Sequence, residues 1–393
     1  MAGRLLGWLL ERIGQPRVIG ELLAGIAFGP SLLGTLAPGL ADAVMPRSVL
    51  PGLAVLSQVG MALYMFLVGL ELSAGHVRAR ARVALAVSPV AIGVPFLAGV
   101  ILARGLFAPL AGTAATGLTF SLFLGIALSI TAFPVLARIL RDRQLLQTDI
   151  GATALTCAAT NDVVVWCGMA LLIGLTQGAA GAAAATTAGA CVFLALMLAG
   201  VRPAVERLTA RSGASPAAIA LLAVMGTASA VATHLLGIHA VFGAFVAGLI
   251  VPHDSPAAGR LAGALAWPVA ILLPAFFAVS GLRTELGGIA GLGGWLLCLT
   301  LVAVAMFGTG GGAAVAARVS GMPWTRAVPL GILLSTRGLM ELVVANIGLE
   351  RGLIGPALFS MLVVMALATT VATSPLLNLL APALQSRGTG IAR

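Results

Sequence analysis

An Asn–Asp pair interrupts one of the most apolar parts of the chain, in the stretch AATNDVVVWCG (158–168). Asp162 is the only charged residue of the apolar run 150–176. A charge inside a membrane span costs about 2.5–3.5 kcal/mol on insertion scales, and such residues are functional by default. The alternative is a structural carboxylate that pairs with a buried arginine or a helix end. We predict that Asp162, with its neighbour Asn161, carries the chemistry of this chain.

The preceding apolar run contains a proline at the place where a break would expose oxygen atoms to this carboxylate. In SITAFPVLARIL (129–140), Pro134 removes a backbone hydrogen bond and clashes with the preceding helical turn. Unwinding near Thr131 would leave carbonyl oxygens beside the following span, and hard cations bind carbonyl and carboxylate oxygens. The same stretch is compatible with a simple proline kink.

A second interruption occurs near the C-terminus, in LLSTRGLMELVV. Ser335, Thr336 and Gly338 weaken a helix there, while Arg337 and Glu341 are four residues apart and would share one helical face. If both interrupted spans cross, helix ends meet in mid-membrane, where a carboxylate would offset the positive ends and Arg337 the negative ones. A purely structural Arg–Glu pair is the alternative.

The composition places these residues in a membrane protein. Of 393 residues, 60% are hydrophobic and 9% are charged, with a mean hydropathy of +1.10, whereas soluble domains carry about 25% charged residues. The net charge of +10 comes from arginines between the apolar runs, which argues against nucleic acid as a partner. The Cys and His residues do not cluster, so the sequence predicts no metal centre, no cofactor and no enzyme site.

Apolar runs of about 20 residues predict membrane spans, and thirteen such runs occur. They are 1–14, 17–37, 49–73, 83–103, 115–140, 150–176, 182–201, 215–236, 238–252, 264–282, 289–317, 325–349 and 353–381. The first is too short to cross comfortably, so we expect that it is either truncated at its start or only half-inserted. Sixteen of the 22 arginines fall in one set of alternate loops, which predicts a cytoplasmic C-terminus.

The two halves of the chain repeat each other weakly. ELLAGIAFGP (21–30) resembles FVAGLIVP (245–252), and MFLVGLEL (65–72) resembles FFAVSGLRTEL (276–286). The matching spans cross in opposite directions, and the seventh span separates two six-span halves. Inverted repeats are typical of transporters whose substrate site lies at the repeat interface.

Several motifs together resemble the monovalent cation:proton antiporter-2 family, in particular its plant cation/proton exchangers and their bacterial relatives. They are GELLAGIAFGPSLLG, SITAFPVLARILRDRQLLQTDIGA, NDVVVW, GIHAVFGAFVAGLIVP, and STRGLMELVVANIGL with VMALATT, and they cover residues 15–380. The resemblance implies an all-α polytopic membrane protein with the sodium/proton antiporter fold, in which two broken helices cross. It also implies a homodimer in the lipid membrane that works by elevator-like alternating access.

The resemblance further assigns roles to individual residues. Asp162 matches the carboxylate that binds a cation and a proton in turn, and Thr131 matches the unwound stretch beside it. Asn161 occupies a position that holds Asp or Asn in relatives. Thr309 stands where relatives have a lysine, so both partners of a family ion pair are neutral here. We therefore expect Asn161 and Thr309 to face each other across the core.

The family's architecture predicts how the chain is divided. The dimerisation part is expected at about 1–82 and 215–287, the core part at 83–176 and 289–382, and a linker helix at 182–201, without a cytoplasmic regulatory domain. The expected function is electroneutral exchange of Na⁺ or K⁺ for H⁺ in a bacterial cytoplasmic membrane. The alternatives are an uncoupled cation carrier or channel and a non-transporting membrane sensor or assembly partner.

Overall fold

The computed structural model describes residues 2–12, 15, 17–29, 31–40, 46, 48–71, 74–177, 180–237, 240–252, 254–282 and 289–380, and these residues are almost entirely helical. The helices are α1 (Ala2–Arg12), α2 (Arg17–Phe28), α3 (Leu33–Leu36), α5 (Leu50–Glu71), α6 (Ala74–Leu110), α7 (Gly117–Ser129), α8 (Phe133–Asp142), α9 (Asp149–Gln177), α10 (Ala180–Ala195), α11 (Arg202–Ser212), α12 (Pro216–Leu235), α13 (Ala240–Leu249), α14 (Pro256–Leu282), α15 (Gly291–Met306), α16 (Gly312–Val319), α17 (Trp324–Leu334), α18 (Leu339–Glu350) and α19 (Pro356–Leu379), with π-helical segments η1 (Leu196–Val201) and η2 (Phe307–Gly311).

Each of the thirteen predicted apolar runs contains a helix. Within the described ranges, ten helical stretches are long and apolar enough to cross a membrane, and α13 and α17 are shorter apolar helices. Some helices extend beyond the predicted runs: α6 begins at Ala74 rather than near residue 83, and the helix expected at 182–201 continues through η1 into α11. Arginine-rich turns at these ends lower the hydropathy but do not interrupt helical hydrogen bonding, because arginine is a good helix former.

Both predicted interruptions are breaks in the helices. The first break lies at residues 130–132 between α7 and α8, and Pro134 stands in the first turn of α8, where a missing N–H costs nothing. The second break lies at residues 335–338 between α17 and α18. The two breaks are hydrogen-bonded to each other, since the Ala132 N–H donates to the Thr336 carbonyl at 2.9 Å. The broken helices therefore cross at this point.

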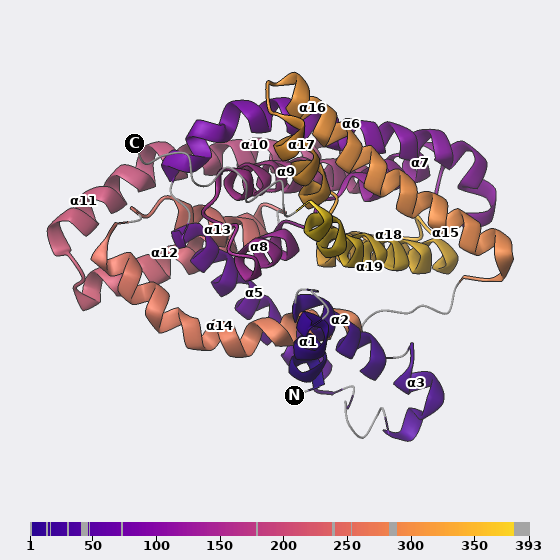
Figure 1. Cartoon of the computed structure of the whole chain (residues 1–393), viewed down its shortest axis with the longest axis horizontal. Helices are drawn as coiled ribbons and strands as arrows, with labels where there is room; N and C mark the ends of the chain where they lie inside the picture. Colours follow the sequence, from indigo (N-terminus) through magenta and orange to yellow (C-terminus); the bar gives the residue numbers. More distant parts are fainter. Residues whose placement is uncertain are drawn as a thin grey trace.

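The helices pack as two groups, and each group contains helices from both halves of the chain. In one group, α2 packs against α14, and α5 packs against α13 and α14. In the other, α6 packs against α7 and α9, while α16 packs against α17 and α15 against α19. In Figure 1, α1, α2, α12 and α14 lie toward the bottom and left, and α6, α7, α15 and α19 toward the upper right. Helix α10 packs on α9, and α11 reaches α12, so this segment connects the two groups.

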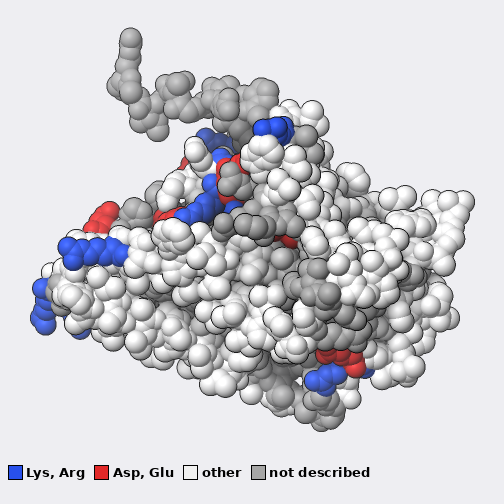
Figure 2. Space-filling model, turned by 90° about the horizontal axis from the view of Figure 1, so that it is seen from below, with Lys and Arg blue, Asp and Glu red and all other residues white. Residues whose placement is uncertain are grey.

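The surface agrees with a membrane environment. Figure 2 shows a face that is mostly uncharged, with charged side chains gathered at the left end, in the upper part and at the lower right. Large apolar side chains such as Trp267, Phe307 and Val319 are more than 70% exposed. The interior, by contrast, holds an arginine: Arg337 is the largest of the fully buried side chains among the described residues. The chain is an integral membrane protein with a charged centre.

Candidate functional site

Asp162 is buried on α9, where its side chain is only 2% exposed. One of its carboxylate oxygens, Oδ2, has no hydrogen-bond partner, and no arginine forms an ion pair with it among the residues that the structure describes. A buried carboxylate without a partner is costly as a bare charge. The site therefore favours an occupant that neutralises it, which a proton or a cation can do.

Asn161, the residue before it, is fully buried and ties α9 to the first break. Its Nδ2 donates a hydrogen bond to Thr131 Oγ1 at 3.3 Å, and its Oδ1 has no partner. The Thr131 hydroxyl in turn donates to the Leu334 carbonyl at 3.0 Å, in the last turn of α17. One short chain of hydrogen bonds thus joins α9 to both broken helices, and it leaves an amide oxygen and a carboxylate oxygen unsatisfied on adjacent residues.

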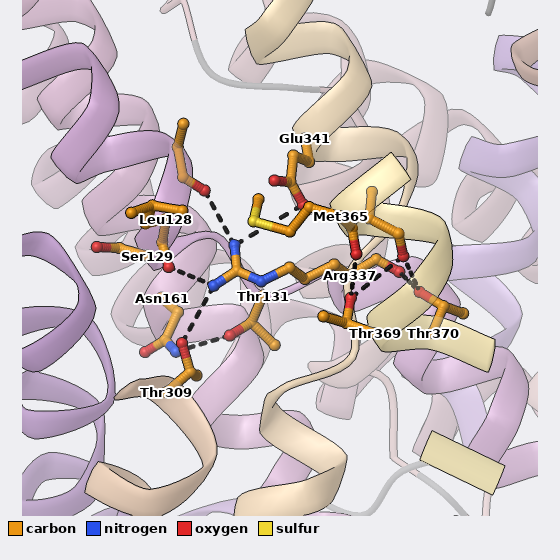
Figure 3. A network of polar contacts seen from close by, with 12 residues as sticks. Leu128, Ser129, Thr131, Asn161, Thr309, Arg337, Glu341, Met365, Thr369 and Thr370 are labelled. Carbon is orange, nitrogen blue, oxygen red and sulfur yellow. Dashed lines mark hydrogen bonds and ion pairs between the residues drawn. The ribbon is translucent and has the colours of Figure 1, made fainter. Parts of the chain in front are cut away.

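Arg337 projects from the second break to the end of the first broken helix. Its Nη1 donates to the Ala127 carbonyl at 2.9 Å, and its Nη2 donates to the Leu128 carbonyl (Figure 3). Both carbonyls lie in the last turn of α7, which ends at Ser129. The last carbonyls of a helix have no partner within it and carry its negative dipole end. The guanidinium therefore lies where the sequence led us to expect a compensating positive charge.

Glu341 forms the expected pair with Arg337 one turn later. Its Oε2 lies 3.7 Å from Arg337 Nη1, and both side chains are fully buried. Neither carboxylate oxygen of Glu341 accepts a hydrogen bond, although the residue stands in the first turn of α18. Its charge is therefore balanced by Arg337 and by the positive end of α18.

Thr309 has a hydrogen-bond partner that the sequence did not predict. It is fully buried in η2, and its hydroxyl accepts a hydrogen bond from Arg337 Nη2 at 3.2 Å, whereas no hydrogen bond joins it to Asn161. The two residues appear in the same close-up, each bonded to a different partner (Figure 3). Thr309 bonds Arg337 because the long arginine side chain extends from the second break to the Thr309 hydroxyl. Sequence reasoning missed this contact because it compared only α9 with the helix that carries Thr309.

The remaining predicted residues shape the breaks. Ser335 Oγ donates to the Ile332 carbonyl of its own helix at 2.8 Å, while Thr336 Oγ1 lies 3.3 Å from Thr373 Oγ1 of α19. A Cβ added at Gly338 would lie 2.7 Å from Val135 Cγ2, so the second break can approach α8 only with glycine there. The threonines of α19 were not predicted as site residues, although their polarity within an apolar span was a visible signal.

The available donors suit a hard cation. They are carboxylate, amide and hydroxyl oxygens, which alkali and alkaline-earth ions prefer over nitrogen or sulfur. Within the described ranges, no group of three His, Cys, Asp or Glu residues could hold a transition metal. Among these donors in the described part of the chain, Asp162 contributes the one carboxylate without an ion-pair partner, which fits an ion of low charge that must also leave again.

Comparisons with known proteins place this arrangement in a family. The family described as "sodium/hydrogen exchanger, transmembrane" matches residues 2–379. The chain is 40% identical to a Na⁺/H⁺ antiporter, NhaS4, of the cyanobacterium Synechocystis, over 97% of this chain and 94% of that protein. It is 36% identical to cation/H⁺ antiporter 19 of Arabidopsis thaliana and 32% identical to K⁺/H⁺ antiporter 1 of Saccharomyces cerevisiae, and covers 48% and 44% of their lengths.

A solved structure has the same fold. The sodium proton antiporter MjNhaP1 of Methanocaldococcus jannaschii at pH 8 superposes with a TM-score of 0.63 over 97% of this chain and 92% of that one, at 13% identity. At that identity the likeness concerns the fold alone, whereas the sequence matches concern the family. The chain belongs to the transmembrane sodium/hydrogen exchanger family.

Proposed function

We propose that this chain exchanges a monovalent cation, Na⁺ or K⁺, for H⁺ across the membrane, with Asp162 binding the two in turn. The observation that carries the proposal is the buried carboxylate with an unpartnered oxygen, on the residue that follows Asn161, whose side chain bonds Thr131 at the first break. The names of the relatives, which include Na⁺/H⁺ and K⁺/H⁺ antiporters, support the same class of substrates.

Competition for one carboxylate would couple the two fluxes. An ionised Asp162 with no bound ion is costly to bury. The change between the inward-open and outward-open states is therefore favoured only when a proton or a cation neutralises this carboxylate. The unpartnered Oδ1 of Asn161 and the hydroxyl of Thr131 would add neutral oxygen ligands for the cation. Arg337 and Glu341 would hold the helix ends in place without taking part in the exchange.

The two packing groups would move against each other. In this proposal α1–α5 and α12–α14 form the dimerisation part of a homodimer, α6–α9 and α15–α19 form the moving core, and α10–α11 links them. One polar contact between the groups is the ion pair between Arg141 of α8 and Glu71 of α5 at 2.8 Å. The arginine distribution supports a cytoplasmic C-terminus, and we propose that the spans lie in the lipid of a bacterial cytoplasmic membrane.

A pH-gradient assay tests the exchange. Purified protein in vesicles with an acidic, dye-quenching interior should restore fluorescence when Na⁺ or K⁺ is added outside, and Li⁺ and Rb⁺ should rank the selectivity. Vesicles without protein provide the control. Recovery that needs an added protonophore would indicate an uncoupled cation carrier instead, and the absence of any cation flux would indicate a non-transporting sensor or assembly partner.

The exchange should be electroneutral. With one unpaired carboxylate at the site and Thr309 in place of a lysine, one cation replaces one proton and no net charge crosses. An imposed membrane potential, set with a permeant anion so that the transported cation is untouched, should leave the initial exchange rate unchanged. A rate that rises or falls steadily with voltage would show that additional charge moves in each cycle.

A further inference from the structure

Helix α19 carries a row of buried hydroxyls inside an apolar span. Thr369, Thr370, Thr373 and Ser374 are all at most 2% exposed, although the span has a mean hydropathy of 1.9. Hydroxyls in a membrane span can satisfy themselves on their own helix, by donating to a carbonyl one turn earlier. A hydroxyl that also bonds a group outside its own helix is a candidate for a specific role.

Two of these residues reach the second break. The Thr370 hydroxyl donates to the backbone carbonyl of Arg337 (Figure 3) and is also within 2.8 Å of the Ala366 carbonyl of its own helix. Thr373 Oγ1 lies 3.3 Å from Thr336 Oγ1 and donates to the Thr369 carbonyl of its own helix at 2.9 Å. Thr369 is equally buried, but its hydroxyl donates only to the Met365 and Ala366 carbonyls of its own helix. Thr370 and Thr373 therefore contact two consecutive residues of the second break, Arg337 and Thr336. The guanidinium belongs to the first of these two.

The inverted repeat gives these contacts a counterpart. The first break, between α7 and α8, is held by the next helix after that pair, through Asn161 of α9 and Thr131. The second break, between α17 and α18, is likewise held by the next helix after that pair, through Thr373 of α19 and Thr336. The residue after Asn161 is Asp162, whereas the residue after Thr373 is Ser374. Helices α9 and α19 thus each form a side-chain contact with one break. Of these two contact residues, Asn161 is followed by a carboxylate and Thr373 is followed by a serine.

We propose that Thr370 and Thr373 are positioning residues that keep Arg337 directed at the end of α7 and away from Asp162. A buried cation and a buried carboxylate attract each other strongly where the dielectric is low. If the break loosened, the guanidinium could turn toward Asp162 and neutralise it in place of the transported ion. The two hydroxyls would prevent this competition, so they act on cation binding through Arg337. The inference rests on the proposed exchange function.

The test removes each hydroxyl at constant volume. Thr370→Val and Thr373→Val should raise the apparent KM for the cation by about two- to tenfold, the range that one or two neutral hydrogen bonds provide. The maximal exchange rate should change less than the apparent KM. Thr370→Ser and Thr373→Ser restore the hydroxyl and should restore the apparent KM, which a merely structural role would not require.

Thr369→Val is the matched control, because it removes a hydroxyl of the same burial from the same helix without touching the second break. It should leave the apparent KM at the wild-type value. The inference is overturned if all three valine variants have the same apparent KM, or if serine fails to restore it. These results would leave the exchange function intact, because that function fails only if the wild-type protein shows no cation-dependent proton flux, and the inference would then fail with it.

Discussion

Replacement of Asp162 by Asn is expected to abolish cation-dependent proton release while the protein stays folded. An amide neither carries the proton nor supplies the negative charge that a cation needs, so both halves of the exchange are lost together. Because Asp162 Oδ2 has no hydrogen-bond partner, the substitution leaves no other group unpaired. It also removes a charge that is costly to bury, so the apparent melting temperature should equal or exceed that of the wild-type protein.

The matched control is Asp149→Asn, the same chemical change at the first residue of the same helix. The Asp149 side chain is 50% exposed and lies 3.7 Å from Arg326, and exposed ion pairs contribute only about 0–1 kcal/mol. This variant should exchange at close to the wild-type rate. Normal exchange by Asp162→Asn in the vesicle assay would show that the ion-binding carboxylate has been assigned to the wrong residue.

The breaks could be predicted because local rules decide them. Pro134 cannot continue a helix whose preceding turn needs its N–H, and Gly338 costs helical stability wherever it stands in a helix interior. The Arg337–Glu341 pair was predicted from a spacing of four residues on one helical face. In the structure the pair forms although Arg337 lies in the break before α18. These features depend on the sequence within one turn, and the structure contains them where they were expected.

Contacts between distant helices could not be predicted in the same way. The partner of Thr309 depends on how far a guanidinium extends across the crossing, and the sequence does not give the angle at which α17 and α18 pass α7. The hydrogen bond that Arg337 donates to Thr309 was not predicted for that reason, and the expectation that Thr309 faces Asn161 stays a prediction. Thr370 and Thr373 were missed because a threonine on an apolar helix bonds its own carbonyls by default.

Replacement of Arg337 by Met is expected to lower the stability of the protein more than any other substitution proposed above. Glu341 would be left fully buried with no compensating side chain, and breaking a buried pair in this way costs about 3–5 kcal/mol. The carbonyls of Ala127 and Leu128 would also lose their donor, at about 1–3 kcal/mol for each buried group left unsatisfied. Thermal unfolding in detergent should show a strongly lowered melting temperature. Arg143→Met, a partly exposed arginine that donates to α19, should lower it far less.

The double variant Arg337→Met with Glu341→Leu separates the stranded charge from the lost helix cap. Replacing both members of a buried pair by apolar residues is often neutral or stabilising, so the double variant should be more stable than Arg337→Met alone. A double variant that is less stable would mean that Glu341 is not stranded when the arginine is removed. If the double variant regains stability and still exchanges no cations, the buried pair serves the geometry of the crossing, because the end of α7 then lacks the charge that holds it beside the second break.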